Sequence, residues 1–166
     1  MANLQNERTK KLIFMGFKEL LNNKAFSKIT INEIAEEAMI HRSTFYTHFD
    51  DKYDLLRQYL ISQRIDSNFD NNEFFQHPFT TIATINKQDL LPIFKSQNKD
   101  FEFRTGFFQF VMDTVISVNS DKSELDKFFF IGRIKAINLW IDKTHQPYNP
   151  FEDFEYLDKI FQTGKE

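Results

Sequence analysis

The spacing of apolar residues between positions 30 and 57 constrains the fold of this chain more than any other feature. Four of them recur at three- and four-residue steps, the pattern of one buried helix stripe: Ile31, Ile34, Ala35 and Ala38. Thr30 or Asn32 can cap this helix at its N-terminus. Phe45 and Phe49, four residues apart, predict a second short helix after a tight turn, and Lys52 stands at the start of a third. This layout is typical of a helix-turn-helix.

The second short helix has a polar and aromatic outer face. When Phe45 and Phe49 face inward, six residues share the outside: Arg42, Ser43, Thr44, Tyr46, Thr47 and His48. The N-terminal end of a recognition helix, where His41 also stands, meets base edges in the major groove. We therefore expect this face to read double-stranded DNA, with bracing of the helix as the alternative role for His48.

Phosphate contacts are expected from residues around the same helix. Lys52 follows Asp50 and Asp51, either of which can cap the third helix, and an ammonium at a helix N-terminus can hold a phosphate. Tyr46 and Thr30 can donate their hydroxyl hydrogens to the DNA backbone. The candidate DNA-binding residues are therefore Thr30, His41, Arg42, Ser43, Thr44, Tyr46, Thr47, His48 and Lys52.

Three motifs in this region carry a resemblance to a known family. They are Thr-Ile-x-x-Ile-Ala-x-x-Ala over residues 30–38, Ser-Thr-Phe-Tyr-x-His-Phe over residues 43–49 and Lys-x-x-Leu-Leu over residues 52–56. Together they resemble the N-terminal DNA-binding domain of the TetR/AcrR family of regulators. That family usually has a glycine in the turn, where this chain has Met39. The turn must therefore either avoid a positive φ or carry strain.

The resemblance implies an all-α fold with two parts. Residues 1–52 would form a three-helix DNA-binding domain with the helix-turn-helix, and residues 53–166 a helical C-terminal domain for regulation and dimerisation. The implied function is that of a transcriptional repressor that binds a palindromic operator as a homodimer. A small apolar or aromatic effector would release it by favouring a spacing of the two DNA-binding domains that does not fit the operator.

Composition limits the other classes of protein. Four glycines and four prolines leave few helix breakers, and the absence of cysteine excludes disulfides and thiolate metal sites. No apolar run is long enough to span a membrane, and the N-terminus lacks the apolar core of a secretory signal, so we expect a cytoplasmic protein. The four histidines are scattered, and no catalytic constellation or phosphate loop is present. We therefore expect no enzyme activity, cofactor or metal.

The charge of the chain is distributed unevenly. The net charge is −3, of which residues 1–57 contribute +1 and residues 58–166 contribute −4. This pattern predicts a local phosphate footprint and salt-sensitive DNA binding rather than a strongly basic domain. The weak basic charge also fits an alternative function, that of a protein-binding coregulator that keeps this fold but acts mainly through its C-terminal surface.

Beyond residue 57 the sequence predicts further helices separated by polar breaks. A linking helix is expected over residues 52–69, and breaks are expected at Asn68–Pro78 and at residues 119–121. The further helices are expected over residues 88–99, 101–118 and 122–144, and from Pro150 or Phe151 to Phe161 with Asn149 as the cap.

Phenylalanine is unusually frequent, with 21 in the chain and runs such as residues 128–130. Neighbouring residues of a helix point about 100° apart, so such runs cannot all face one small core. Some would meet a partner subunit or a ligand cavity, unless the core stripe is simply wide. Residues 131–141 followed by residues 146–151 resemble the end of a compact C-terminal domain in some TetR-like regulators of Gram-positive bacteria, where the last two long helices form the dimer interface. The candidate interface residues are Phe128, Ile131, Gly132, Lys135, Ala136, Leu139, Trp140, Phe151 and Phe154.

Overall fold

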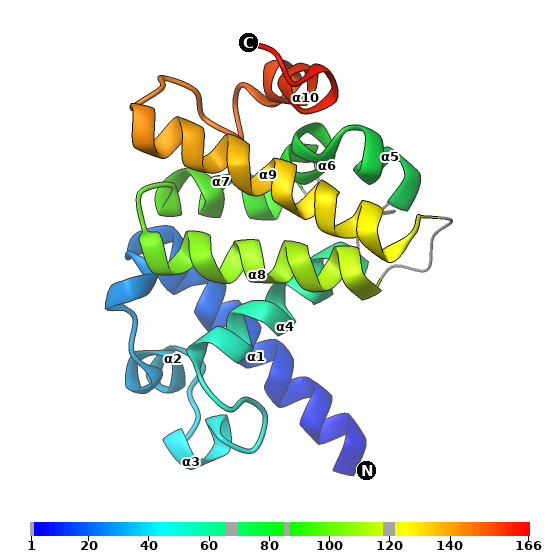
Figure 1. Ribbon diagram of the computed structural model, residues 1–166. Helices are drawn as coiled ribbons and strands as arrows, with labels where there is room; N and C mark the ends of the chain where they lie inside the picture. Colours follow the sequence, from blue (N-terminus) through cyan, green and yellow to red (C-terminus); the bar gives the residue numbers. More distant parts are fainter. Residues whose placement is uncertain (1, 66–69, 85–86, 118–121) are drawn as a thin grey trace. The chain divides into compact units, whose positions relative to one another are not determined.

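The computed structural model describes residues 2–65, 70–84, 87–117 and 122–166. These residues form α-helices and one 3-10 helix and contain no strand, which confirms the predicted all-α class. Figure 1 labels the helices in chain order. Their bounds are α1 Ala2–Asn23, η1 Phe26–Lys28, α2 Ile31–Glu37, α3 Arg42–Phe45, α4 Lys52–Ile65, α5 Asn71–Gln76, α6 Pro78–Thr84, α7 Lys87–Gln97, α8 Phe101–Ser117, α9 Glu124–Thr144 and α10 Phe154–Thr163.

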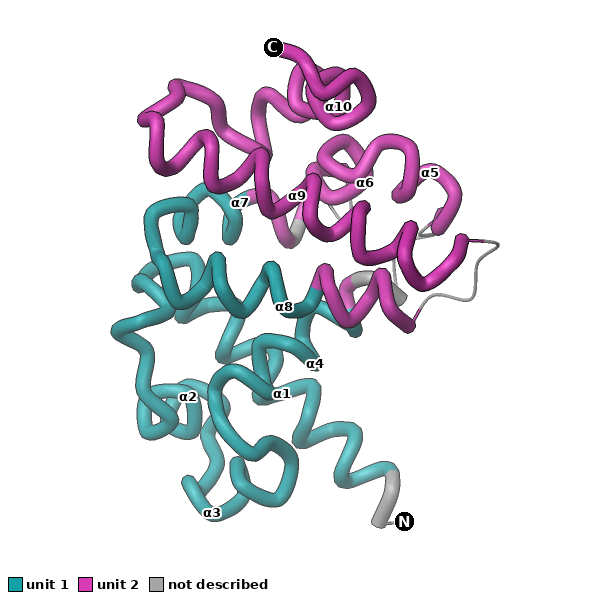
Figure 2. The backbone as a smooth tube through the Cα atoms, in the orientation of Figure 1, with its two compact units in different colours: residues 1–62, 92–110 teal, residues 63–91, 111–166 magenta. Residues whose placement is uncertain are grey.

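The chain divides into two compact units, which Figure 2 colours separately. Unit 1 comprises residues 1–62 and 92–110, and unit 2 comprises residues 63–91 and 111–166. Unit 1 therefore contains the helix-turn-helix together with the end of α7 and the first part of α8. The sequence predicts a boundary between a DNA-binding domain and a regulatory domain at residues 52 and 53. The division into compact units does not test that functional boundary, which stays a prediction.

In unit 1, α1 and α2 approach closely at Gly16. A Cβ atom on Gly16 would lie 3.1 Å from both the backbone nitrogen of Ala38 and the Cγ atom of Glu37. Glycine thus lets the first helix of the helix-turn-helix lie against α1. The core nearby is aromatic, since Phe17 and Phe26 are fully buried with their rings edge to face at 6.2 Å.

A buried glutamine ties the second segment of unit 1 to the first. Gln97 is fully buried, and its amide nitrogen donates to the carbonyl oxygens of Leu21 and Lys24. Its amide oxygen accepts from the backbone N–H of Phe26 at 2.8 Å. The last carbonyls of a helix lack partners within that helix. Gln97 therefore caps the end of α1 from 76 residues further along the chain.

In unit 2, a ring cluster joins α9 to α5 and α10. Ser123 and Asp126 form a capping box that starts α9. Phe130 lies 5.3, 4.8 and 5.2 Å, between ring centroids, from three other rings: Phe74, Phe75 and Phe161. The described residues include 20 of the 21 phenylalanines, and eleven of these are buried, so core packing accounts for about half of the aromatic excess.

The polar break predicted over Asn68–Pro78 is wrong across its described part, where α5 and the start of α6 form. The Asp70 carboxylate caps α5 by accepting from two backbone N–H groups. The first turn of α6 is capped by Asp158, which is buried and accepts from the N–H groups of Phe79 and Thr80 at 2.9 Å each. That cap lies 79 residues from the helix, so the local sequence does not reveal it.

The last helix begins later than the sequence predicts. α10 starts at Phe154, and Asn149 does not cap it. The N–H of Asn149 instead donates to the Asp153 carboxylate at 2.7 Å, which closes a turn before the helix. The break expected at residues 119–121 and the end of the linking helix near Phe69 lie outside the described residues.

Candidate DNA-binding surface

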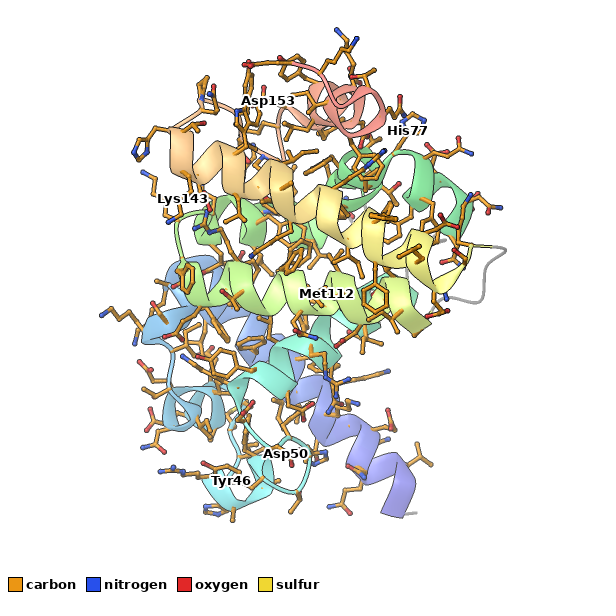
Figure 3. The ribbon with its side chains drawn as sticks, in the orientation of Figure 1. Tyr46, Asp50, His77, Met112, Lys143 and Asp153 are labelled. Carbon is orange, nitrogen blue, oxygen red and sulfur yellow. The ribbon has the colours of Figure 1, made fainter. Side chains whose placement is uncertain are left out.

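Two buried phenylalanines orient α3 within unit 1. Phe45 on α3 and Phe49 shortly after it are 0% and 2% exposed, and their ring centroids lie 5.6 Å apart. This anchoring leaves the opposite side of the helix at the surface, with Tyr46 labelled in Figure 3. His41, Arg42, Ser43, Tyr46 and Thr47 are exposed, and Thr44 and His48 are half-buried. The two inward residues and four of the six outward ones lie as the spacing predicted, whereas Thr44 and His48 are partly covered.

Arg42 and Tyr46 form a pair on this exposed face. Nη2 of Arg42 donates to the hydroxyl oxygen of Tyr46 at 3.1 Å, and the guanidinium carbon lies 5.7 Å from the ring centroid. Residues four apart share one helix face, which explains the contact. Because the hydroxyl oxygen accepts from Arg42, its hydrogen can be donated to a phosphate. The guanidinium keeps further N–H donors for a base edge.

Thr30 caps α2 in a capping box. Its hydroxyl oxygen accepts from the N–H of Glu33 at 3.3 Å, and the Glu33 carboxylate accepts from the N–H of Thr30 at 2.9 Å. The hydroxyl hydrogen of Thr30 is also directed at this carboxylate, at 2.8 Å. Hydrogen bonds from Lys24 and Thr30 lower the pKa of Glu33 to about 2. A phosphate would therefore compete with Glu33 for the Thr30 hydroxyl.

His48 is half-buried, with its ring centroid 6.1 Å from that of Phe49. Burial and then the positive charge of Lys10 lower the pKa of its imidazole below 6.5, although Glu7 acts in the opposite direction. This lowered pKa favours the neutral form of the ring. A neutral imidazole in this position can brace the helix against Phe49 or hydrogen-bond to DNA, so both roles predicted for His48 fit its placement.

Lys52 turns its ammonium toward the protein. It is the first residue of α4, which Asp51 caps by accepting from backbone N–H groups of the first turn. Nζ donates to the carbonyl oxygens of Phe26 at 3.1 Å and Ser27 at 3.4 Å, and it lies 3.1 Å from the Glu102 carboxylate. The side chain is 17% exposed. The predicted phosphate contact would require this ammonium to leave one of its partners.

Met39 carries the turn of the helix-turn-helix in a left-handed backbone conformation. Its φ is 53°, and its side chain is 87% exposed. The turn is closed by the N–H groups of Met39 and Ile40, which donate to the carbonyls of Glu36 and Ala35 at 3.0 and 2.9 Å. Of the two alternatives that the sequence left open, the strained one is found, because a Cβ disfavours this conformation by about 1–2 kcal/mol.

The candidate dimer residues in unit 2, which lie on α9 and around the start of α10, are mostly exposed. Phe128, Gly132, Lys135, Ala136 and Leu139 are exposed, Trp140, Phe151 and Phe154 are half-buried, and Ile131 is buried. Ile131 thus contributes to the core of unit 2. The exposed stripe also includes Leu125 and Phe129, at 63% and 64%, which the sequence analysis did not select. Their seven-residue offsets from Gly132 and Ala136 could have identified them.

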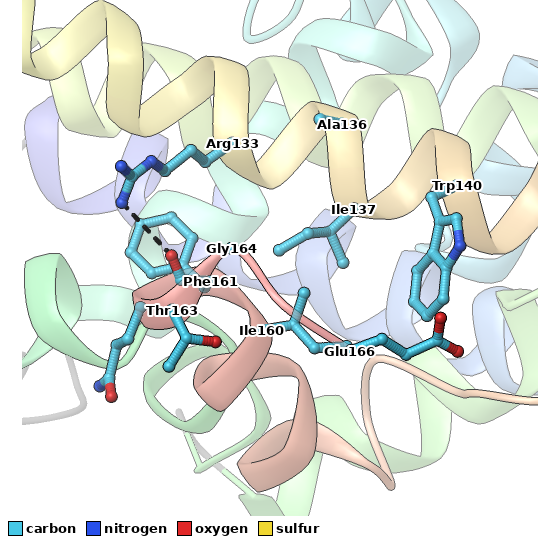
Figure 4. Close-up of a pocket in the computed structure, with 10 residues that line it drawn as sticks. Arg133, Ala136, Ile137, Trp140, Ile160, Phe161, Thr163, Gly164 and Glu166 are labelled. Atoms are coloured by element: carbon cyan, nitrogen blue, oxygen red, sulfur yellow. Dashed lines mark hydrogen bonds between the residues drawn. The ribbon is translucent and has the colours of Figure 1, made fainter.

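A pocket of about 390 Å³ lies between α9 and the C-terminal end of α10 in unit 2 (Figure 4). Arg133 donates to the carbonyl oxygen of Phe161 at 3.3 Å at one side of this pocket. The Trp140 ring lines the other side and stacks on Tyr148 with a centroid distance of 5.7 Å. Ala136, Ile137 and Ile160 add apolar side chains to the lining, and Gln162, Thr163 and Glu166 add polar and acidic ones.

Two further properties concern membranes and metals. None of the helices in the described ranges is both long and apolar enough to cross a membrane. Over the same ranges, His, Asp and Glu side chains do not gather in groups of three that could hold a metal ion.

Three residues at the end of α7 and the start of α8 contact the N-terminal segment of unit 1 and were not predicted from the sequence. Gln97 caps α1, Asp100 accepts from the N–H of Ser27 at 2.9 Å, and Glu102 pairs with Lys52. Polar residues near a helix boundary are ordinary in sequence. Their partners lie about fifty or more residues away, so no local pattern marks them.

Comparisons with known proteins agree with the helix-turn-helix. Residues 18–59 match the family model described as "Bacterial regulatory proteins, tetR family". The HTH-type dhaKLM operon transcriptional activator DhaS of Lactococcus lactis subsp. lactis (strain IL1403) is 26% identical over 121 residues, which cover 70% of this chain and 65% of DhaS. The match therefore spans less than two thirds of the length of that relative.

Similar solved structures include two of NalD, described as the secondary repressor of the MexAB-OprM multidrug efflux pump in Pseudomonas aeruginosa. They are 16% and 17% identical to this chain, and the alignments cover 96% of it and 97% and 96% of the NalD chains. The TM-score is 0.47 for each.

Proposed function

We propose that this chain is a DNA-binding regulator of transcription, because residues 18–59 match the model of the tetR family of bacterial regulatory proteins. The observation that carries the proposal is the outer face of α3. Phe45 and Phe49 fix one side of this helix in the core of unit 1, and the other side presents polar and aromatic side chains. Such a helix can enter the major groove and set its N-terminal side chains against base edges.

The residues divide into proposed base readers and proposed phosphate contacts. Arg42 has the donor geometry for a bidentate contact with a base edge, and Tyr46 holds it from one side. The further base readers in this proposal are His41, Ser43, Thr44 and Thr47. The phosphate contacts are Tyr46, Thr30 and Lys52, and they would fix the register of the helix without reading sequence. His48 would face the DNA groove or brace α3 against Phe49.

We further propose that the regulator acts as a homodimer through α9. Its exposed stripe repeats at seven-residue steps, with Leu125, Gly132 and Leu139 along one line. A Cβ atom on Gly132 would meet nothing within 4 Å inside the described protomer, so a second copy of α9 could approach closely there. A two-fold dimer presents two α3 helices, which suits a palindromic operator with half-sites about one DNA turn apart.

Repression is the simplest regulatory outcome of this arrangement, because a dimer on an operator blocks the DNA without needing further contacts. The pocket beside Trp140 and Arg133 is the proposed site of a small apolar or aromatic effector. An effector that binds the operator-incompatible spacing of the dimer more tightly than the compatible one would release the DNA.

Selection of bound duplexes from a random DNA pool by the purified chain tests this proposal. We expect a palindrome to be enriched, and Arg42→Ala to relax selection at one position of each half-site and to cost about 1–3 kcal/mol of binding. Lys143→Ala, which removes an exposed positive charge from α9, is the matched control and should leave selection unchanged. Binding should weaken steeply as salt is raised.

Two results would contradict the proposal. Failure to enrich any sequence at low salt would exclude direct DNA reading and favour the alternative of a protein-binding coregulator. The exposed Phe128 and Phe129 would then be the residues to test in partner binding. Enrichment that survives Arg42→Ala unchanged would place the reading surface elsewhere than on α3.

A further inference from the structure

Three acceptors surround the ammonium of Lys52, one for each of its three hydrogens. An ammonium carries three N–H donors. In unit 1 its acceptors are the carbonyl oxygens of Phe26 and Ser27, at 3.1 and 3.4 Å, and the carboxylate of Glu102, at 3.1 Å. The ammonium also lies 4.7 Å from the ring centroid of Phe26, which favours a cation there. A DNA phosphate must displace one of these partners to bind Lys52.

Glu102 is the partner that a phosphate would displace most easily. Both carbonyls belong to η1, and the backbone of this helix is held by Gln97 and Asp100. Glu102 is a side chain at the start of α8 and is 40% exposed. Exposed ion pairs are weak in water, so exchange of one anion for another is readily reversible. Phosphate and carboxylate offer the ammonium the same kind of contact.

The first turn of α8 keeps this carboxylate beside Lys52. The buried Asp100 accepts from the N–H groups of Ser27 and Phe103, at 2.9 and 2.8 Å, which fixes the beginning of α8 against η1. The hydroxyl of Tyr53 donates to Glu102 at 2.8 Å. Glu102 therefore contacts Lys52 from a segment that lies about fifty residues further along the chain.

We propose that Glu102 is a positioning residue that limits DNA affinity by competing with a phosphate for the ammonium of Lys52. This inference rests on the proposed function. While Glu102 is paired with Lys52, the ammonium attracts fewer counterions and contributes less to phosphate binding. Any change that draws the start of α8 away from η1 would free the ammonium for DNA. The contact therefore makes the strength of DNA binding depend on the position of α8.

Glu102→Gln tests the competition, because it removes the charge and keeps an oxygen that can accept from Tyr53. Fluorescence anisotropy of the full chain with a labelled duplex, over a series of salt concentrations, gives affinity and salt dependence. We expect Glu102→Gln to bind about two- to fivefold more tightly, the size of an exposed ion pair. The slope of log affinity against log salt should steepen by up to about 0.9, the value of one added phosphate contact.

Two further variants separate competition from a general effect of charge. In the Lys52→Met background, Glu102→Gln should leave both affinity and slope unchanged. Glu36→Gln removes an exposed negative charge from α2 and should act equally in both backgrounds. Thermal unfolding of each variant checks that the fold is retained.

The outcomes distinguish this inference from the function on which it rests. Tighter binding by Glu102→Gln that depends on Lys52 supports the inference. The inference is overturned if Glu102→Gln leaves the salt slope unchanged, or if it still tightens DNA binding in the Lys52→Met background. In either case, DNA binding by the unaltered chain leaves the proposed function standing. Absence of duplex binding by both the unaltered chain and Glu102→Gln overturns both.

Discussion

At the residue scale, the turn of the helix-turn-helix depends on the left-handed conformation of Met39. The side chain is 87% exposed, so burial of methionine does not compensate for its positive φ of 53°. Glycine at this position removes the Cβ that makes the conformation unfavourable. We expect Met39→Gly to raise the free energy of unfolding by about 0.5–1 kcal/mol, because the greater freedom of glycine in the unfolded chain offsets part of the relief. Urea denaturation measures the difference.

Met39→Ala is the matched control for this prediction. Alanine also lacks the long side chain but retains the Cβ, so it should not stabilise the protein. If Met39→Ala gains as much as Met39→Gly, the methionine side chain rather than the backbone is the source of the effect.

Also at the residue scale, Arg42 and Tyr46 should act on DNA together. The phenol of Tyr46 accepts from Arg42 at 3.1 Å, so Tyr46→Phe removes both a phosphate donor and the support of the guanidinium. We expect Tyr46→Phe to weaken operator binding by roughly 1–2 kcal/mol, and Arg42→Ala to cost less in that background than in the unaltered chain. A double-mutant cycle of operator affinities measures this coupling, and strictly additive effects would show that the pair is not a functional unit.

At the element scale, the start of α2 depends on an ionised Glu33. Its pKa of about 2 lies below the ordinary 4.5, so the folded chain binds this proton less tightly than the unfolded chain does. The stabilisation is therefore fully present above pH 4.5 and is lost as the pH falls toward 2. Glu33→Gln should destabilise the protein at about pH 7, and the difference should shrink near pH 3. Urea unfolding at both pH values tests this, and a pH-independent difference would contradict it.

At the same scale, Gln97 joins α7 to the end of α1. Gln97→Leu keeps a similar volume but leaves the N–H of Phe26 and the carbonyls of Leu21 and Lys24 without this partner. We expect a loss of about 2–4 kcal/mol in the free energy of unfolding, since each buried polar group left unpaired costs about 1–3 kcal/mol. Asn98→Leu, at the exposed neighbouring position, is the control and should change little.

The elements show which parts of this fold can be predicted from sequence. The helix-turn-helix was predictable because its apolar steps and the Thr30 cap lie within a few residues of each other. α6 was not, because its cap is Asp158, 79 residues away. The same limit applies to the candidate site. The outward residues of α3 follow from the spacing of Phe45 and Phe49, whereas the engagement of Lys52 by Glu102 depends on a tertiary contact.

At the scale of the whole molecule, the proposed homodimer can be tested through α9. Phe128 and Leu139 are 57% and 43% exposed, and a charge at either position would be costly in a packed apolar interface. We expect the Phe128→Asp, Leu139→Asp double variant to sediment as a monomer and to lose affinity for a palindromic duplex. Phe101→Asp, at an exposed phenylalanine of unit 1, should leave the dimer intact. A double variant that remains dimeric would move the interface away from this stripe.

The discontinuous make-up of unit 1 has a consequence for its synthesis. Residues 92–110 belong to the same compact unit as residues 1–62. A nascent chain that extends only through the helix-turn-helix therefore lacks Gln97 and Asp100. These are the side chains that accept hydrogen bonds from the backbone N–H groups of η1. The unit cannot close until about two thirds of the chain has emerged. Translation arrested before residue 97 should thus yield a nascent DNA-binding segment that is more easily proteolysed than the same residues in the finished chain.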